Sequence, residues 1–252
     1  MSRRRVVVVV VLSAVAGALL LTTRGAADRT ARSVESGVLR VESSGCGRTM
    51  LGSGFLVDRR HVVTAAHVVD DATAIALTRD GRVLARGTIV GADPERDVAL
   101  IRLDRSIRGH ALTFSRRAAK PGEDVVAAGY PRGAPLTMAR GSVRGIATTV
   151  PSSGVVRRPL IQTDAVVSHG ESGGPLVSAA DGEVLGMLDL SSTREGGPSF
   201  AVGAGDLAPL IARWRSDPEA VPQRPCHASS GYPTLPQPSP QSGAASPPPA
   251  HM

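Results

Sequence analysis

Short runs of apolar and β-branched residues, separated by turns rich in glycine, proline and aspartate, recur about every dozen residues through the middle of the chain. Such runs are typical of strands in an all-β protein rather than of alternating strand and helix units. They predict strands at residues 52–57, 73–77, 83–90, 98–103, 125–128 and 184–190. One later segment, residues 206–215, has its apolar side chains at helical spacing and predicts a terminal helix.

Asp181-Gly182 lies between two of these apolar runs. This dipeptide favours a two-residue type I′ hairpin, because that turn needs positive φ at both central positions. The hairpin would join the strand after Ser172 to the strand at 184–190.

The N-terminal residues 1–27 do not share this pattern. Arg3-Arg4-Arg5 precedes an uncharged run at residues 6–21, which is the arrangement of a signal peptide. Gly25-Ala26-Ala27 is an acceptable cleavage site, whereas Arg24 also suits an uncleaved membrane anchor through residues 6–21. Both interpretations place the rest of the protein outside the cytoplasmic membrane, either secreted or in the cell envelope.

The remaining sequence divides into three parts. Residues 28–36 are expected to form a short linker, and residues 37–216 are long enough to bury one globular core. Residues 217–252 are rich in proline and serine, so we expect a disordered tail. A tail that binds a partner or spans the cell wall is the alternative.

The formal charge of +7 is not a nucleic-acid signal. Four arginines lie in residues 1–27 together with no acidic residue, so the rest of the chain carries +3. Its remaining arginine pairs are scattered, and aromatic residues that could stack on bases make up only 2% of the chain. We therefore expect no nucleic-acid partner.

Three segments carry residues suited to nucleophilic catalysis. His67 ends Thr64-Ala65-Ala66-His67, Asp97 begins Asp97-Val98-Ala99-Leu100, and Ser172 lies within Gly170–Leu176. A serine hydroxyl needs an imidazole to take its proton, and the imidazole needs a carboxylate to fix its tautomer. The order His, Asp, Ser is the one found in chymotrypsin-like enzymes. Asp93 and Glu95 are close enough in sequence to remain alternatives to Asp97.

The glycines around Ser172 suit a second requirement of acyl transfer. A tetrahedral oxyanion needs two backbone N–H donors in a tight turn, and the amides of Gly170 and Ser172 are the expected pair.

Together these segments resemble the chymotrypsin-like (trypsin-fold) serine proteases, in particular the bacterial HtrA/Deg-like branch and actinobacterial exported members. The resemblance extends from about residue 37 to residue 215 and also includes Gly52-Ser53-Gly54-Phe55 and Gln162-Thr163-Asp164-Ala165. It implies two six-stranded antiparallel β-barrels with a C-terminal helix and an exported serine endopeptidase that acts on proteins or peptides. It implies no cofactor and no metal, and no PDZ-like module is recognised. A non-catalytic binding module on the same fold is the alternative.

The resemblance also suggests how substrates are selected. Val166 takes the place of the residue at the floor of the primary pocket, so small or medium apolar side chains are expected there rather than Lys or Arg. Asp189, Leu190 and Ser191 would form the edge on which an extended substrate pairs. Glu171 stands where trypsin has the acid that captures its new N-terminus. The sequence lacks the matching activation site, so no such zymogen cleavage is expected.

The chain has two cysteines, Cys46 and Cys226. In an exported protein an even number of cysteines is read first as a disulfide. Similar actinobacterial proteases carry a cysteine at the place of Cys46, which supports a Cys46–Cys226 bridge. Two free thiols or an intermolecular bridge are the alternatives.

Overall fold

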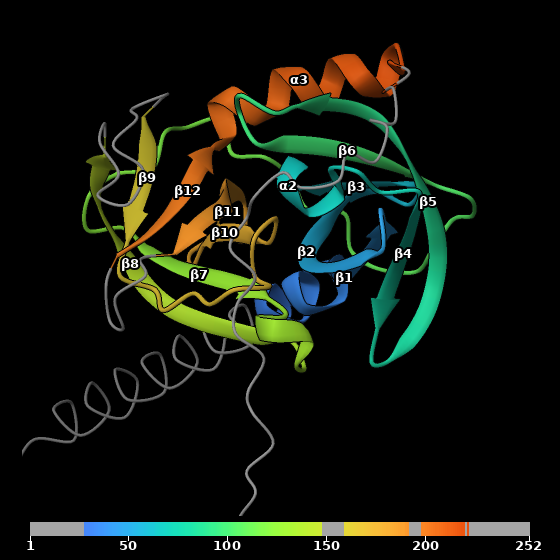
Figure 1. The fold of residues 1–252 in the computed structure, drawn as a ribbon. Helices are drawn as coiled ribbons and strands as arrows, with labels where there is room; N and C mark the ends of the chain where they lie inside the picture. The colour runs from blue at the N-terminus through green and yellow to red at the C-terminus, as the bar shows by residue number, and fades with distance from the viewer. Residues whose placement is uncertain (1–27, 148–158, 192–197, 220, 222–252) are drawn as a thin grey trace, which may run out of the picture.

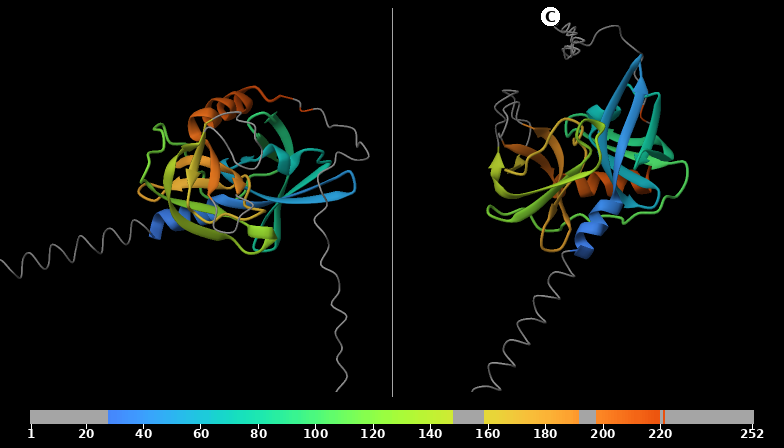
Figure 2. Two further views of the ribbon diagram at one scale, coloured as in Figure 1. Left: turned by 60° about the vertical axis from the view of Figure 1, so that its left-hand side comes forward. Right: turned by 90° about the horizontal axis from the view of Figure 1, so that it is seen from below.

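The computed structural model describes residues 28–147, 159–191, 198–219 and 221. These residues form two barrels that lie side by side, with helix α3 (Ala204–Ser216) across one end of the pair (Figures 1 and 2). The predicted N-terminal segment 1–27 and nearly all of the predicted tail lie outside the described residues.

The first barrel is a closed sheet with the strand order β1-β2-β3-β6-β5-β4. Its strands are β1 (Val38–Gly45), β2 (Arg48–Asp58), β3 (His61–Thr64), β4 (Ala74–Arg79), β5 (Arg82–Asp93) and β6 (Val98–Leu103). All neighbouring strands are antiparallel. Residues 52–56 of β2 are continuously buried, because they pack on the barrel interior with one face and on neighbouring elements with the other.

The second barrel closes in the order β10-β11-β12-β9-β8-β7. Its strands are β7 (Asp124–Gly129), β8 (Thr137–Ala147), β9 (Leu160–Thr163), β10 (Pro175–Ser178), β11 (Val184–Ser191) and β12 (Ser199–Gly203). A separate apolar cluster that includes Leu176, Leu185 and Leu188 fills it. The predicted fold of two six-stranded antiparallel barrels is therefore confirmed.

The six predicted strands are all present, each with its ends within four residues of those expected. The hairpin after Ser172 also joins the expected strands, but the predicted type I′ turn is wrong. Ser178 donates its N–H to the carbonyl of Glu183 at 2.9 Å, so four residues form the loop. Gly182 has a φ of 76°, whereas Asp181 is not in the left-handed region. The Asp181 carboxylate accepts the Glu183 N–H at 3.0 Å, which favours the longer loop.

Helix α3 confirms the predicted terminal helix and touches strands of both barrels. Leu207, Ile211 and Trp214 are buried on its inner face. Trp214 lies against Gly91 of β5 so closely that a Cβ on Gly91 would stand 2.1 Å from the indole ring. The missing side chain at Gly91 therefore lets α3 dock on the first barrel.

The predicted linker at residues 28–36 is wrong, because residues 28–37 are helical. Val34 is 2% exposed and belongs to the main apolar cluster. The Ser36 hydroxyl accepts the N–H of His110 at 3.1 Å. Because the segment has one buried apolar residue, its sequence shows no helical periodicity. Its contacts with the rest of the fold stabilise the helix. Within the described residues, no helix combines the length and apolar character needed to cross a bilayer.

Candidate active site

His67 is held by a single helical turn, α2 (Ala66–Val69). Ala66, Val68 and Val69 are buried, which leaves His67 as the residue of this turn that faces outward. Gly52 of β2 allows the close approach of α2, because a Cβ on Gly52 would stand 2.5 Å from the Val68 side chain. The Gly-Ser-Gly segment of β2 therefore positions the imidazole.

Asp97 accepts two hydrogen bonds from His67. One carboxylate oxygen accepts the backbone N–H of His67 at 2.8 Å, and the other lies 2.7 Å from its ring Nδ1. Asp97 has a φ of 49°, a left-handed conformation that is uncommon outside glycine, at the turn before β6. Because a carboxylate can only accept, Nδ1 carries the hydrogen and Nε2 keeps its lone pair.

Of the two alternatives to Asp97, Asp93 is engaged elsewhere. Its carboxylate accepts the backbone N–H of Arg96 at 2.9 Å and pairs with the Arg96 guanidinium at 2.6 Å. Glu95 is exposed. Of these three candidates, Asp97 is the one whose carboxylate hydrogen-bonds to His67.

The two partners shift each other's pKa. Burial alone would lower the pKa of His67, but the hydrogen bond and charge of Asp97, aided by the charge of Asp189, raise it above the usual value. Burial alone would raise the pKa of Asp97, but the contacts with His67 outweigh it and hold that pKa below its usual value. Asp97 therefore stays ionised, and His67 binds a proton more tightly than a free histidine.

Ser172 is half-buried on the turn that precedes β10 and is tied to β11. Its hydroxyl donates to the backbone carbonyl of Asp189 at 3.1 Å, and the next residue, Gly173, donates its N–H to Leu188 at 2.7 Å. Among the described residues, no hydrogen bond joins Ser172 to His67. The serine hydroxyl therefore needs a side-chain rotation to reach the imidazole.

All four backbone carbonyl groups of the turn at residues 169–172 accept hydrogen bonds. His169 accepts from the Arg132 N–H at 2.7 Å, and Glu171 accepts from the Gly174 N–H at 2.9 Å. Ser53 holds the other two: its hydroxyl donates to Gly170 at 2.8 Å and its N–H donates to Ser172 at 2.9 Å. Four carbonyls fixed in this way leave the turn little freedom to change its shape.

The same carbonyls orient the two expected oxyanion donors. In a trans peptide the N–H points opposite to the C=O, and the described residues contain no cis peptide bond. The Gly170 N–H therefore points away from Arg132, and the Ser172 N–H points away from Gly174. In the described part of the chain neither N–H has a hydrogen-bond partner, so both are open to an acceptor.

Gly170 meets a double requirement in this turn. Its φ is 95°, and a Cβ there would stand 2.6 Å from the Arg132 nitrogen and 2.7 Å from the Tyr130 carbonyl oxygen. Any side chain would therefore be both strained and obstructed. Arg132 itself has a φ of 50° inside the 3-10 turn η1 (Pro131–Gly133).

Glu171 is only 2% exposed between the two donor residues. Its carboxylate accepts the Ser168 N–H at 2.6 Å and the Thr137 hydroxyl at 2.9 Å. Both partners belong to the second barrel. Glu171 therefore stabilises the turn at residues 169–172 through contacts inside the barrel that carries it.

Of the expected specificity residues, Asp189 contacts Ser172 through its backbone carbonyl. Val166 is 67% exposed, so the expected pocket floor is open to solvent. Leu190 and Ser191 pair with Phe200 and Ser199 of β12. On the opposite side of β11, pairing with β10 ends at Met187. Within the described residues that edge of 189–191 has no strand beside it.

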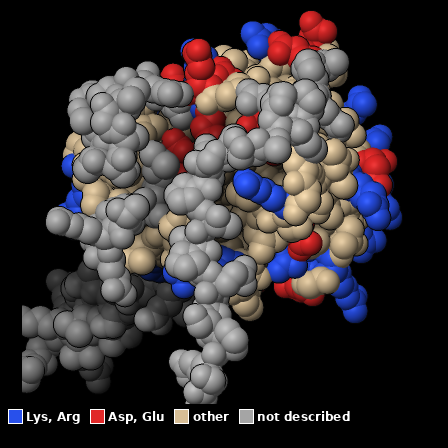
Figure 3. All heavy atoms as spheres, in the orientation of Figure 1, with Lys and Arg blue, Asp and Glu red and all other residues tan. Residues whose placement is uncertain are grey.

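Acidic atoms are set back in the hollow between the barrels (Figure 3). His67, Asp97 and Asp189 each offer a ligand atom, and these atoms lie within 4.8 Å of one another. A divalent ion at this place would compete with the His67–Asp97 hydrogen bond. We therefore interpret the three groups as a proton-handling cluster.

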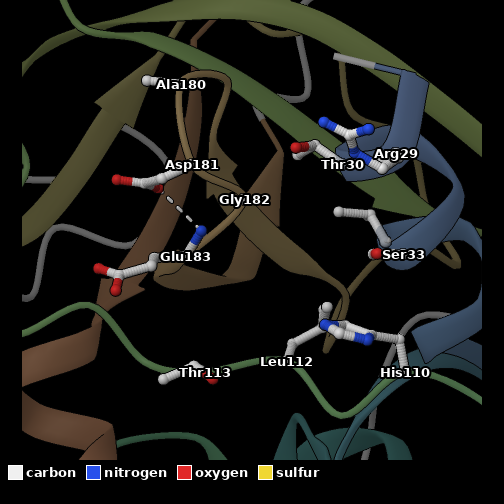
Figure 4. Close-up of a pocket in the computed structure, with 11 residues that line it drawn as sticks. Arg29, Thr30, Ser33, His110, Leu112, Thr113, Ala180, Asp181, Gly182 and Glu183 are labelled. Atoms are coloured by element: carbon white, nitrogen blue, oxygen red, sulfur yellow. Dashed lines mark hydrogen bonds between the residues drawn. The ribbon is translucent and has the colours of Figure 1, made fainter. Parts of the chain in front are cut away.

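A pocket with a volume of about 420 Å³ lies elsewhere, between the helical segment 28–37 and the loop that joins β10 to β11 (Figure 4). Arg29, Thr30 and Ser33 face Ala180–Glu183 across it. None of its lining residues belongs to the cluster around His67.

Cys46 occupies the turn between β1 and β2. Cys226, the chain's other cysteine, lies outside the described residues. The Cys46–Cys226 pairing stays a prediction.

Comparison with known proteins agrees with the fold. Residues 52–187, more than half of the chain, match the family described as trypsin-like peptidase domain. The chain therefore belongs to the trypsin-like peptidase family, as the sequence motifs predicted.

Its curated relatives include proteins named probable periplasmic serine endoprotease DegP-like. The one from a Marinomonas species is 34% identical over 174 residues, which is 68% of this chain and 36% of the relative. The one from Halomonas elongata is 38% identical over 175 residues, with the same two shares. The chain thus spans just over a third of the length of these relatives.

Among solved structures, the active form of the Rv3671c protease from M. tuberculosis superposes with a TM-score of 0.68 at 27% identity, covering 78% of this chain and 88% of that one. Its inactive form gives a TM-score of 0.62 at 28% identity, covering 73% and 91%. A serine endoprotease from Yersinia pestis, 24% identical with a TM-score of 0.64 over 76% of this chain and 67% of that one, shares the fold.

Sequence reasoning missed two residues that shape the site. Ser53 was recognised as part of a motif, but its bonds to the serine turn were not foreseen; the Gly-Ser-Gly spacing was the available signal. Arg132 carried no signal, because its contribution is a backbone N–H presented by an unusual φ.

Proposed function

We propose that this protein is an exported serine endopeptidase that hydrolyses peptide bonds through an acyl-enzyme on Ser172. The observation that carries this function is the pair of hydrogen bonds from Asp97 to the backbone N–H and the ring Nδ1 of His67, which leaves Nε2 as a base. Asp189, whose carboxyl group lies in the same cluster as His67, accepts the Ser172 hydroxyl through its backbone carbonyl. The membership of the trypsin-like peptidase family supports this function.

In the proposed reaction, the Ser172 hydroxyl rotates from the Asp189 carbonyl to His67 Nε2. Nε2 takes the proton as the oxygen attacks the substrate carbonyl, and Asp97 stabilises the imidazolium that forms. The Gly170 and Ser172 N–H groups receive the oxyanion. His67 then gives the proton to the leaving amine, and water, activated by the same base, releases the acyl group.

The substrate is proposed to be an extended protein segment that pairs with the open edge of β11 at residues 189–191. Its primary side chain would cover the exposed Val166, and apolar contact there favours a small or medium apolar residue. An unpaired cation on valine would lose hydration without gaining a partner.

The names of the relatives place those proteins in the periplasm. Together with the signal-like residues 1–27, this supports an extracytoplasmic location for the protein.

The direct test is labelling of the purified full chain with a fluorophosphonate probe, together with cleavage of an unfolded protein. We expect labelling of the native protein and none of Ser172→Ala, whose circular dichroism should be unchanged. Absence of both labelling and cleavage in the native protein would overturn the proposed function.

One observation gives weight to a non-catalytic binding module. The Ser172 hydroxyl bonds to Asp189 rather than to His67. The labelling experiment separates the two functions, because a binding module would not react with the probe.

A further inference from the structure

Asp189 is displaced from the regular pairing of β11. Leu188 pairs with Ala201 and Leu190 pairs with Phe200, so two neighbouring residues of β12 face three residues of β11. Asp189 is the extra residue of this β-bulge. Bulges redirect a side chain that would otherwise follow the alternation of the strand.

The displaced residue reaches both reacting groups of the proposed triad. Its backbone carbonyl accepts the hydroxyl of Ser172 at 3.1 Å. Its carboxyl group lies with the His67 and Asp97 ligand atoms in a cluster less than 4.8 Å across. One residue thus contacts the nucleophile through its backbone and approaches the base through its side chain.

Among the described residues, the charged groups that act on His67 come from two places in the fold. Asp97 precedes β6 and Asp189 lies on β11, and these two are the charges that act on the imidazole of α2. Arg96, the nearest cation in sequence, is paired with Asp93 and is also influenced by Asp206 of α3. When the Asp189 carboxyl group holds a proton, it donates a hydrogen bond to Asp97 and favours the charged form of Asp97. When it is ionised, it places a second negative charge beside His67.

We propose that Asp189 is a positioning residue of the triad, whose carboxyl group supplies a second acidic charge to the His67 imidazolium while its carbonyl holds the resting Ser172 hydroxyl. This role presupposes the triad chemistry proposed above. A second acid beside the base stabilises the protonated imidazole in the transition state. It also makes that imidazole bind a proton at higher pH, so the enzyme would lose activity earlier on acidification.

The decisive measurement is an NMR titration of the His67 imidazole in the full chain carrying Ser172→Ala, which prevents self-cleavage. Adding Asp189→Asn should lower the pKa of His67 by about 0.5 to 1 unit, because it removes a charge roughly 5 Å away without changing side-chain size. The resonance is assigned by its loss in His67→Gln. Asp189→Ser is a second uncharged replacement in case the Asn variant does not fold.

Asp104→Asn is the matched control, since it removes the same charge from an exposed acid that pairs with Arg105 on the first barrel. In enzymes with Ser172 intact, the acid limb of the kcat/KM profile should move to lower pH in Asp189→Asn and not in Asp104→Asn.

An unchanged pKa of His67 in both Asp189 variants would show that the residue serves only the strand, and the inference would be overturned. This outcome is distinct from failure of the proposed function, which is read from fluorophosphonate labelling of the native protein. The titration needs no catalytic turnover and therefore decides the inference in either case.

Discussion

The Ser53 hydroxyl donates to the carbonyl of Gly170 at 2.8 Å, so a strand of the first barrel holds the turn that presents the nucleophile from the second. The same oxygen accepts the N–H of Tyr130 at 2.9 Å. Ser53 is 0% exposed, so both of these partners depend on it rather than on water.

Ser53→Ala should therefore impair both activity and stability. It leaves the Gly170 carbonyl and the Tyr130 N–H without this partner, and each buried polar group left unpaired costs about 1 to 3 kcal/mol. We expect kcat/KM to fall about tenfold or more, which corresponds to about 1.4 kcal/mol of transition-state stabilisation. Rates and urea unfolding of the same samples give the two values.

Ser216→Ala is the control for Ser53→Ala, because among the described residues that hydroxyl bonds to carbonyls at the exposed end of α3 and to no other group. Its activity should equal that of the native protein. Equal rates for Ser53→Ala and Ser216→Ala would show that the turn keeps its shape without the hydroxyl.

The pH dependence of activity follows from the contacts of His67. Its pKa is raised above 6.5, and only the neutral imidazole can accept the serine proton. Activity should therefore be full above this raised pKa and decline as the pH falls through it. A kcat/KM profile from about pH 5 to 9 measures the midpoint, which must lie above the usual histidine value of about 6.5.

The contribution of His67 to the stability of the fold changes with pH in the opposite direction to the activity. A pKa raised by folding means that the fold favours the protonated imidazole, so this contribution is complete below pH 6.5 and is lost as the pH rises through the folded-state pKa. The pKa of Asp97 is lowered by folding, so Asp97 stabilises the fold at pH values above its usual pKa and loses this contribution on acidification.

Asp97→Asn should lower kcat by about 10⁴, because the amide would favour the wrong tautomer of the His67 ring.

The close packing of α3 on the first barrel predicts that Gly91 does not tolerate a side chain. A Cβ on Gly91 would stand 2.1 Å from the ring of Trp214, so Gly91→Ala should destabilise the protein by about 1 to 3 kcal/mol. Trp214 is the chain's one tryptophan, so its fluorescence reports the displaced helix directly. Thermal unfolding followed by this signal gives the midpoint.

Gly205→Ala, within α3, is the matched change without a clash. A Cβ there meets nothing within 4 Å, and alanine in a helix is favoured over glycine by about 0.5 to 1 kcal/mol. This variant should be slightly more stable than the native protein. Equal effects of the two substitutions would contradict the close packing of Trp214 on Gly91.

The predicted Cys46–Cys226 bridge is tested by peptide mass spectrometry under non-reducing conditions. We expect a linked peptide pair that disappears on reduction, and Cys226→Ser should lower the stability by at most about 5 kcal/mol through the entropy of a long loop. A free Cys226 thiol in the exported protein would contradict the pairing.

Local sequence patterns were sufficient for six of the strands and for α3, and they marked the three segments that carry His67, Asp97 and Ser172. Each of these depends on neighbours within a few residues: alternation in a strand, helical spacing in α3, and glycines around the serine. The preference for Asp97 over Asp93 also came from the apolar run that follows it. The structure agrees, because it pairs Asp93 with Arg96.

The remaining features depend on residues far apart in the chain. The bulge at Asp189 is a mismatch between β11 and β12, and the bond from Ser53 to Gly170 crosses 117 positions. The helix at residues 28–37 is held by buried Val34 and by the bond between Ser36 and His110. No local sequence pattern encodes a register shift or a contact between barrels. These features could therefore be recognised only in the three-dimensional structure.

Val166 offers the sharpest test of substrate selection. Its side chain is 67% exposed and apolar, so a substrate residue that covers it gains by apolar contact. Val166→Asp should move the preference toward Lys and Arg, because a carboxylate at that position pairs with the cation that valine leaves without a partner. Cleavage-site profiling of a denatured proteome measures the change, with Val83→Asp, an equally apolar site on β5 that is 61% exposed, as the control. If Val166→Asp and Val83→Asp both kept the native profile, Val166 would not contact the substrate side chain, and the selecting residue would have to be sought elsewhere along the edge of β11.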